Sequence, residues 1–464
     1  MREKRMGAMN RLLTRDTNYY HDLLRLAIPV ALQNLITFLV SFADNLMVNT
    51  LGDGAVSGVY MGSQIQVLLQ MFTSGIGGAV IIIGAQYWGK HDTLHIRRIV
   101  GIGLRFAALV GAILTAVCAL FPTQIIRVFT SDPLVIAEGA VYLRCVCFSF
   151  VFFCITQVLL ASMRCVETAN VGMYVSAISL VVNVCLNYVL IFGKFGFPAL
   201  GVRGAAIATL ICRIVETCVA LFYVLRVDKK LSFSLTDTLN GDSELTRDFI
   251  RYGTPLVLGE IVWSVNMMAN SIILGHYGAS VITAASVANT MNTLAYVAIN
   301  GLATAMGIIT GKTIGAGKTE LMKEYARTTQ VIFLTLGFVI GALTVLIAGP
   351  FVSLYGGISA EAAVQSTLFI RVLSVTLIGT CYQMPCLFGL VKSGGDISFV
   401  FKNDTIFVFL VVLPSAIIAS YLGAAPWVVF ACLKCDQILK CFVAVVKVNR
   451  YNWMKNLTRT TAAS

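Results

Sequence analysis

Charged residues are scarce in this sequence. Lys, Arg, Asp and Glu make up 12% of its 464 residues, whereas 58% are hydrophobic; a typical soluble domain has about 25% charged residues. This shortage excludes an ordinary water-soluble enzyme or binding module. The formal net charge is +12, but the basic residues lie between apolar runs rather than in one patch, so we expect no nucleic-acid partner.

Several other signals are also missing. The 9 prolines and 39 glycines are dispersed, so no long linker is predicted. The 13 cysteines stand singly, without metal-ligand spacing, and are expected to be buried free thiols. The polar, basic start of the chain predicts no cleavable signal peptide. No nucleophile with a nearby base can be proposed from spacing, so we expect neither an enzyme nor a resident cofactor.

Two motifs that resemble binding sites are better explained by their context. His91 and His95 have a spacing that suits a metal, but a solvated surface helix explains them, and no metal site is predicted. The stretch Gly311–Thr319 resembles a phosphate-binding loop. That motif requires glycine where Lys312 stands and a strand where an apolar span precedes it, so an ATP-driven pump is not expected.

Apolar runs dominate what is present. A hydrocarbon core of about 30 Å needs about 20 apolar residues in a helix, and only helices satisfy their own backbone in lipid at this length. We therefore predict an all-α polytopic membrane protein with twelve transmembrane helices. The expected spans are 24–49, 56–83, 98–121, 135–161, 170–192, 203–226, 250–275, 281–310, 326–349, 361–390, 399–421 and 426–448.

The connections between these runs alternate in charge. Both tails (1–23 and 449–464) and the even-numbered connections are rich in Lys and Arg, including the longest one, 227–249. Basic connections remain on the cytoplasmic side. Both termini are therefore predicted to be cytoplasmic in a multi-pass inner-membrane protein.

The two halves of the chain repeat each other with a constant offset of 226. The offset relates Pro29 to Pro255, Gly52 to Gly278, and Gly75 to Gly301. It also relates small-residue faces that let helices approach closely. We predict two six-helix lobes, 24–226 and 250–448, related by an axis along the membrane normal and enclosing a cleft. Two such lobes suit a transporter; a static duplicated bundle is the alternative.

Asp44 is the clearest ionisable residue within a span, where charge is costly and usually functional. It shares a helical face with Gln33, Thr37 and Ser41, and counting from Pro29 places it in the outer half of the membrane. A carboxylate there is suited to load and release a proton. Asn183 and Asn187, one turn apart, either share a cation with Asp44 or hold helices together.

Glu260 is the corresponding acid of the second half, and its repeat partner is Asn34. It is either a second coupling group or a satisfied carboxylate on the inner side. Intrahelical ion pairs with structural roles are predicted for Arg213–Glu216 and for Asp436–Lys440. The residues predicted to line a substrate cleft are Gln33, Asn34, Thr37, Ser41, Thr209, Asn289, Asn292, Tyr296 and Gln383.

The chain resembles the multidrug and toxic compound extrusion (MATE) family of cation-coupled antiporters over nearly its whole length. The resemblance is carried by Asn183–Gly204 with the following Ala-Ala-Ile-Ala-Thr209, by the segment from Pro29 to Gly52, by the turn Gly394-Gly395-Asp396, and by Trp453-Met454-Lys455. It implies a bacterial exporter of organic, often cationic compounds in exchange for protons or sodium ions.

The resemblance also assigns residues. Asp44 and Asn183 match a cation-coupling site in the N-terminal lobe, whereas Asn187 stands where many relatives of the DinF type have aspartate. Relatives of the NorM type carry a glutamate eight residues after the seventh-span proline. Here Glu260 comes five after Pro255, and Trp263 holds the eighth place. The chain is therefore predicted to be closer to the DinF type.

These observations together predict a monomeric secondary transporter that exchanges H+ or Na+ for small organic molecules within membrane lipid. The alternative is a flippase for a lipid-linked sugar, which would need cations facing its cleft to hold a pyrophosphate. A membrane-embedded enzyme or receptor would need a polar catalytic cluster or a soluble domain, and the sequence indicates neither.

Overall fold

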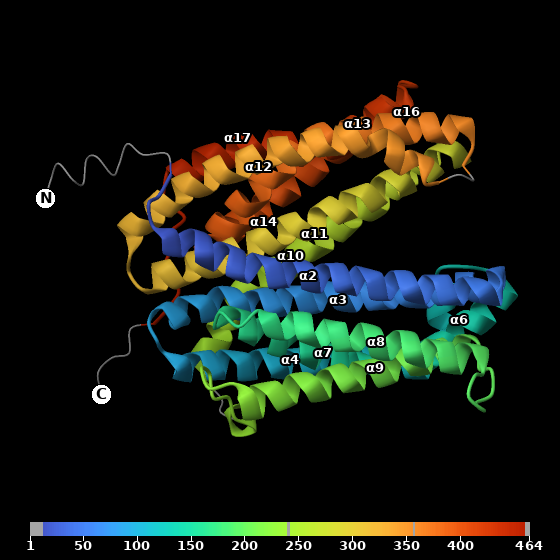
Figure 1. Ribbon diagram of the computed structural model, residues 1–464, viewed down its shortest axis with the longest axis horizontal. Helices are drawn as coiled ribbons and strands as arrows, with labels where there is room; N and C mark the ends of the chain where they lie inside the picture. The colour runs from blue at the N-terminus through green and yellow to red at the C-terminus, as the bar shows by residue number, and fades with distance from the viewer. Residues whose placement is uncertain (1–12, 239–241, 356–357, 460–464) are drawn as a thin grey trace, which may run out of the picture. The chain divides into compact units, whose positions relative to one another are not determined.

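The computed structural model describes residues 13–238, 242–355 and 358–459, and these are almost entirely helical (Figure 1). The continuous helices are α2 (Thr17–Val48), α3 (Asp53–Gly89), α4 (Thr93–Leu120), α8 (Asn170–Phe192), α9 (Val202–Phe222), α10 (Ser243–Gly275), α11 (Ala279–Gly315), α12 (Thr319–Ser353) and α13 (Ala360–Met384). Within these ranges no strand is present. The predicted all-α fold is confirmed.

Shorter helices complete the chain. They are η1 (Asn49–Leu51), α5 (Pro122–Arg127), α6 (Pro133–Val146), α7 (Ser149–Cys165), η2 (Tyr223–Val227), η3 (Leu235–Thr238), η4 (Pro385–Lys392), α14 (Ile397–Ile406), η5 (Phe407–Val412), α15 (Leu413–Tyr421), α16 (Pro426–Lys434) and α17 (Asp436–Asn449). Part of the N-terminal tail that was predicted to be cytoplasmic, with the basic residues Arg2, Lys4, Arg5 and Arg11, lies outside the described residues. Parts of the 227–249 connection and of the C-terminal tail also lie outside them.

Ten helical segments in the described part of the chain are long and apolar enough to cross a membrane, and the bent pair α6–α7 makes an eleventh. The twelfth predicted span, 426–448, is divided at Cys435 into α16 and α17. It contains the buried charged residues Lys434, Asp436 and Lys440, which lower its hydropathy. The chain is a multi-span membrane protein.

The predicted span 135–161 is not one straight helix. Its two parts, α6 and α7, meet at an angle of 52°. The hydroxyl of Thr115 on α4 donates to the carbonyl oxygen of Cys147 at 2.8 Å, in the gap between them. The same oxygen also accepts from the backbone nitrogen of Phe150 at 3.0 Å, three residues further on. A side chain that inserts into the hydrogen bonding of a helix is a recognised cause of a kink, and Thr115 comes from another helix, out of reach of local sequence patterns.

The internal repeat is visible in matching helices. α3 and α11 are both 37 residues long, and both start and end at positions related by the offset of 226. Each begins directly after a glycine with positive φ, 95° at Gly52 and 94° at Gly278. That backbone conformation favours glycine because it lacks Cβ. The repeat therefore fixes the same turn between the first two spans of each half.

One difference between the halves lies at Pro122 and Pro350, which match when the offset of 226 is relaxed by two residues. Pro122 starts the separate short helix α5 after Phe121, whereas Pro350 lies inside the continuous helix α12. Proline is tolerated at a helix start but disturbs a helix interior. The helix of the first half therefore ends before Pro122, whereas the corresponding helix of the second half continues through Pro350.

The chain divides into two compact units. The N-terminal unit is Leu32–Val257, and the C-terminal unit combines the residues from Leu258 onward with the described residues up to Ala31. The boundaries at 31 and 257 are related by the repeat offset and lie just after Pro29 and Pro255, inside α2 and α10.

Paired close contacts explain this division. A Cβ at Gly301 would lie 2.8 Å from the carbonyl oxygen of Ala27 and 2.9 Å from Ala31 Cβ, so the start of α2 packs tightly on α11 in the C-terminal unit. The repeat-related Gly75 would meet Val257 Cα at 2.8 Å, which packs the start of α10 on α3 in the N-terminal unit. Each unit therefore takes the first part of one helix from the other half of the sequence.

Small residues on α3 also let two helices of the N-terminal unit approach closely. Added Cβ atoms at Gly54, Gly58 and Gly62 would come within 2.6–2.7 Å of α6, at Leu134, Gly139 and Tyr142. The predicted small-residue face of α3 therefore packs directly against another helix. Within this unit α3, α4 and α7 lie side by side, and α8 lies beside α9 (Figure 1).

Candidate functional site

The Asp44 site is formed by α2 and α8 of the N-terminal unit. The amide nitrogen of Asn187 donates both to Asp44 Oδ1 and, at 3.1 Å, to Asn183 Oδ1. Asn183 and Asn187 are buried, with 2% and 1% exposure, whereas Asp44 is half-buried. The structure thus brings together three of the four residues predicted for cation coupling.

An ion pair on α9 lies beside this site. Arg213 Nη1 donates to Glu216 Oε2 at 2.7 Å, and the guanidinium lies 5.0 Å from the ring centre of Phe153. Arg213 is also within electrostatic range of Asp44. The predicted i,i+3 pair is therefore present, and its position next to Asp44 was not part of the prediction.

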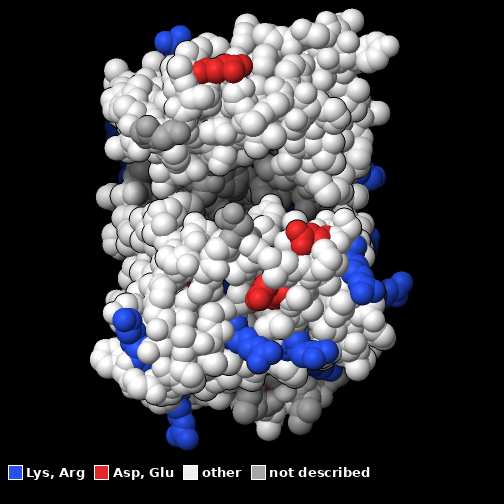
Figure 2. All heavy atoms as spheres, turned by 90° about the vertical axis from the view of Figure 1, so that its right-hand side faces the viewer, with Lys and Arg blue, Asp and Glu red and all other residues white. Residues whose placement is uncertain are grey.

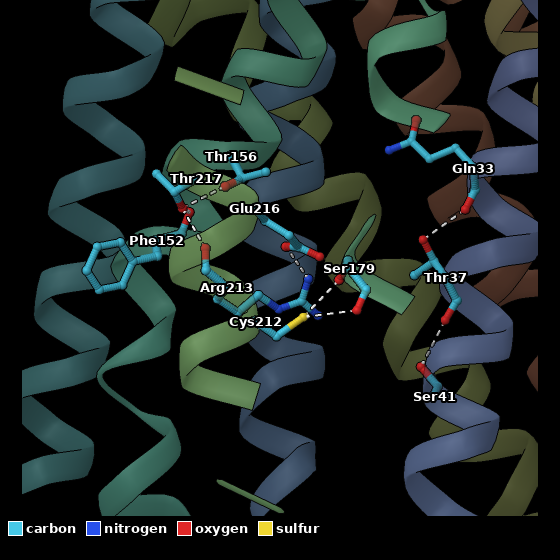
Figure 3. Close-up of polar contacts among 10 residues, drawn as sticks. All are labelled: Gln33, Thr37, Ser41, Phe152, Thr156, Ser179, Cys212, Arg213, Glu216 and Thr217. Atoms are coloured by element: carbon cyan, nitrogen blue, oxygen red, sulfur yellow. Dashed lines mark hydrogen bonds and ion pairs between the residues drawn. The ribbon is translucent and has the colours of Figure 1, made fainter. Parts of the chain in front are cut away.

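Hydroxyl groups extend this polar region, as Figure 3 shows. Thr217 Oγ1 donates to the carbonyl oxygens of Arg213 and Phe152, and it lies 2.9 Å from Thr156 Oγ1. These bonds tie α9 to α7 next to the ion pair, so the Arg213–Glu216 pair sits in a tightly packed part of the unit.

Gln33 was predicted to face a substrate cleft, but in the N-terminal unit it is 5% exposed. Its Oε1 accepts a 2.8 Å hydrogen bond from Arg164 Nη2, and its side-chain amide packs directly on Gly172. Arg164 thereby finds an acceptor for its buried charge. Since the sequence alone did not connect these two residues, the prediction missed this contact.

The hydroxyls predicted beside Gln33 follow the axis of α2 (Figure 3). Thr37 donates to the carbonyl oxygen of Gln33 at 2.9 Å, and Ser41 donates to that of Thr37 at 3.3 Å. Both residues are exposed in the structure, and Asn34 is half-buried. Thr209 on α9 donates likewise to its own helix, at Ala205.

Glu260 lies in the C-terminal unit, on α10. It is half-buried and within electrostatic range of Lys392 and Asp404. Tyr296 on α11 lies within range of the same carboxylate. The other residues predicted for a cleft in this half differ in burial: Asn289 is exposed, Asn292 is half-buried and Gln383 is buried.

A charged network that the sequence did not predict in full lies in the same unit. Lys440 Nζ is 2.8 Å from Asp404 Oδ1 on α14 and 3.0 Å from Asp436 Oδ2 on α17. Gln437 donates to Asp436 and accepts from Gln383. The i,i+4 spacing predicted the Asp436–Lys440 pair, but nothing in the sequence pointed to Asp404, because it comes from another helix.

The Gly394-Gly395-Asp396 turn binds the C-terminal tail. Lys447 Nζ and Lys455 Nζ lie 2.6 and 2.8 Å from the two oxygens of Asp396. The backbone nitrogen of Lys455 donates to the carbonyl oxygen of Gly394. The fully buried ring of Trp453 packs against the Cα side of Gly394, where a side chain would clash with it. The two motifs noted in the sequence thus form one structural clamp.

This clamp predicts a pH-dependent stability. Burial alone raises the pKa of Asp396, but the hydrogen bonds and charges of Lys447 and Lys455 outweigh it and hold that pKa below its usual range. Because the folded-state pKa is lowered, the stabilisation is complete above the unfolded pKa of about 3.9 and is lost as the pH falls through the folded value. We expect Asp396→Asn to cost about 1 kcal/mol at neutral pH, since Lys455 is half exposed and solvent screens its charge.

Thermal unfolding in detergent, followed from pH 7 downward, measures this difference. The unfolding midpoints of the wild type and of Asp396→Asn should differ at neutral pH and converge in acid. A constant difference at every pH would show that the charge of Asp396 does not cause the effect.

The two motifs that resemble a metal site and a phosphate-binding loop can be located in the structure. The predicted helix with two solvated histidines is wrong: His91 precedes α4, and the side chain of His95 is only 15% exposed. His95 Nδ1 lies 2.6 Å from Asp92 Oδ2, and its ring stacks on Tyr87 at 4.9 Å. Gly311–Gly315 is the C-terminal end of α11 rather than a loop after a strand. Both features therefore have structural explanations.

Comparisons with known proteins agree with this architecture. The MatE family model matches residues 29–189 and 255–422. The chain is 29% identical over 356 residues to the probable multidrug resistance protein YoeA of Bacillus subtilis, covering 75% of each chain. It is also 29% identical over 346 residues to the probable multidrug resistance protein NorM of Rhizobium meliloti, covering 72% of this chain and 71% of the relative.

Solved structures show the same fold. The Vibrio cholerae MATE transporter VcmN in its bent form superposes with a TM-score of 0.84 at 16% identity, over 94% of this chain and 97% of the other. A transporter of the MOP superfamily from Pyrococcus furiosus gives 0.83 at 19%, over 95% and 96%. The closer similarity to the DinF type remains a prediction. Since the family model covers most of both halves, the chain belongs to the MATE family of transporters.

Proposed function

We propose that this protein is a secondary antiporter that exports organic, mainly cationic compounds in exchange for protons or sodium ions, by alternating access. The observation that carries the proposal is the half-buried carboxylate of Asp44, placed inside a membrane-spanning helix and bound by Asn187. Ionisable groups within spans are costly and mark ion pathways. Asp44 would bind the coupling ion, and the organic cargo would bind when that ion has left.

Two further observations support this reading. The chain forms two compact units, and alternating access requires two bodies that can move against each other. Relatives of this chain bear the names of multidrug resistance proteins, which favours organic cargo. Coupling further requires that ion and cargo bind the alternating states unequally.

The proposed location is the bacterial inner membrane, with the protein as a monomer and both termini in the cytoplasm. The connections after α3 and α11 carry Lys90 and Lys318, and the helices that follow begin with Arg97 and Lys323 in their early turns. An excess of Lys and Arg marks the cytoplasmic side. Figure 2 shows a face of the molecule that is mostly uncharged, with scattered charged side chains.

The alternative, a flippase for a lipid-linked sugar, needs cationic side chains available to a pyrophosphate. Arg213 is instead paired with Glu216 at 2.7 Å. Lys434, a cation within the last predicted span, is 9% exposed and lies 6.0 Å from the ring centre of Phe430. Both observations favour the exporter.

Transport by the purified protein in lipid vesicles tests the proposal. A fluorescent organic cation is supplied, and proton and sodium gradients are imposed separately. Dye movement driven by either gradient supports coupled antiport. Absence of movement with both gradients, in vesicles that contain folded protein, contradicts it, and translocation of a lipid-linked sugar would favour the flippase.

A further inference from the structure

An arginine recurs at the same place in both halves of the chain and lacks a partner in each. Arg144 lies on α6 and Arg371 on α13, each 11 residues after the first residue of its helix. Both side chains are exposed, and neither guanidinium has a hydrogen-bond or ion-pair partner among the described residues. The span arginines Arg164 and Arg213, by contrast, have acceptors at 2.8 and 2.7 Å. Each unit thus presents one unbalanced positive charge on a membrane-spanning segment.

The helix next to each arginine approaches it in the same way. In the N-terminal unit, Thr115 on α4 donates to the carbonyl oxygen of Cys147 at 2.8 Å. In the C-terminal unit, a Cβ at the repeat-related Gly341 on α12 would lie 2.7 Å from the carbonyl oxygen of Ser374, and α12 runs beside α13 (Figure 1). Cys147 and Ser374 each come three residues after the arginine and donate to its carbonyl oxygen, at 3.3 and 2.7 Å. The two arginines therefore occupy equivalent positions in the two units.

The exposed side chains around each arginine are apolar. Four residues further along the chain, Phe148 and Val375 are exposed. On the neighbouring helices, two residues beyond Thr115 and Gly341, the repeat-related Val117 and Leu343 are exposed as well. Exposed apolar side chains on helices that cross a membrane face lipid. Each guanidinium therefore lies on a lipid-facing surface, where its counter-charge has to come from outside the unit.

The position of Arg371 along its span matches the level of lipid phosphates. The run α13–η4 continues 21 residues beyond Arg371, to Lys392, which corresponds to about 32 Å of helix. Lys392 directly precedes the turn where Asp396 binds two lysines, so its end of the run lies at one edge of the hydrocarbon core. Because that core is about 30 Å thick, Arg371 reaches the opposite edge. In the N-terminal unit α7 likewise ends 21 residues after Arg144, and the bend between α6 and α7 shortens the distance.

A phospholipid supplies both groups that these surfaces call for. Arginine stays charged in proteins, and its planar guanidinium binds phosphate oxygens in pairs. The acyl chains of the same molecule cover exposed apolar side chains such as Phe148 and Val375. Since neither arginine is paired with a described carboxylate, a headgroup that has no cation of its own balances the charge best.

We propose that Arg144 and Arg371 each bind the phosphate of one anionic phospholipid, so that each unit carries one specific lipid site. The two sites are related by the internal repeat, as are the arginines. They face the outer leaflet when both termini are cytoplasmic; this leaflet follows from the orientation given with the proposed function, whereas the binding itself does not depend on it.

Native mass spectrometry of the full-length protein, titrated with single lipids in detergent, tests the proposal without any variant. We expect two molecules of dioleoyl phosphatidylglycerol to be retained more tightly than any further ones, and dioleoylglycerol, which has the same chains but no phosphate, to be retained weakly. Equal retention of the two lipids would overturn the proposal, because phosphate would then not be recognised. Displacement of phosphatidylglycerol by millimolar inorganic phosphate would overturn it too, since the sites would then take a free anion.

Substitutions assign the two lipids to the two arginines. Arg144→Gln and Arg371→Gln should each weaken the binding of one phosphatidylglycerol about fivefold, since one basic residue contributes about 1 kcal/mol near anionic lipid. The double variant should lose both tight sites. Lys318→Gln, at an exposed lysine in the connection after α11, is the matched control and should bind lipid like the wild type.

Wild-type lipid binding in the folded double variant would contradict the proposal. So would a dimer in lipid-free spectra of the wild type that the double variant does not form, because the arginines would then contact a second copy. Arg144→Lys and Arg371→Lys keep the charges and should bind both lipids with an affinity between those of the wild type and of the glutamine variants. If neither gradient drives dye export while lipid binding behaves as described, the proposed function fails and the lipid sites stand.

Discussion

Replacing Asp44 by asparagine is expected to reduce gradient-driven dye export to the level of vesicles without protein, while the protein still folds and inserts. The asparagine oxygen can still accept the hydrogen bond that Asn187 donates to Asp44, and the two side chains have nearly the same shape. The variant cannot ionise, so it neither takes up nor releases a cation. Coupling is lost because no ion then distinguishes the two transport states.

The measurement is initial dye flux with a fixed imposed gradient, normalised to the amount of folded protein. Glu361→Gln, at an exposed carboxyl in the first turn of α13, is a matched control that also removes one carboxylate and should transport like the wild type. Wild-type flux in the Asp44→Asn variant would remove Asp44 from the coupling mechanism.

Lys440→Met should have the largest effect on stability. Lys440 forms ion pairs with both Asp404 and Asp436, and its side chain is 8% exposed. Methionine fills similar space but leaves two neighbouring carboxylates without their cation. Removing one member of a buried ion network typically costs about 3–5 kcal/mol, so a strongly lowered unfolding midpoint or a loss of folded protein is expected.

Thermal unfolding in detergent measures this cost. Lys402→Met, at an exposed lysine two residues before Asp404, is the control and should unfold like the wild type. Adding Asp404→Asn and Asp436→Asn to Lys440→Met removes the unpaired charges and should recover most of the loss. An unchanged midpoint in Lys440→Met alone would show that the network contributes little.

Periodicity and repetition in the sequence predicted much of the architecture. The offset of 226 anticipated that α3 and α11 begin and end at equivalent positions, because helix limits depend on local signals such as Gly52 and Gly278. The bend between α6 and α7 was not predicted. It involves Thr115, a residue on another helix, and local patterns carry no information about such a contact.

The contacts of the candidate site were likewise predicted only where they depend on local sequence patterns or on the family resemblance. Asn183 and Asn187 were correctly placed together because they lie one turn apart on a single helix, and the family resemblance linked them to Asp44. The contacts Arg164–Gln33 and Lys440–Asp404 join helices far apart in the sequence. A single sequence indicates which side chains are costly to bury, but it does not indicate which distant side chain compensates them.

The division of α2 and α10 between the units has a consequence for biosynthesis. Residues 13–31 are synthesised before the rest of the described chain, yet they pack with α11 and α12, for example through the 2.8 Å bond from the Thr14 nitrogen to Thr328 Oγ1. The N-terminal unit is complete once Val257 has been synthesised, whereas the other unit joins residues 13–31 to residues from Leu258 onward. Its assembly must therefore wait until the helices after Leu258 have been synthesised, so the two halves cannot mature as independent, successive domains.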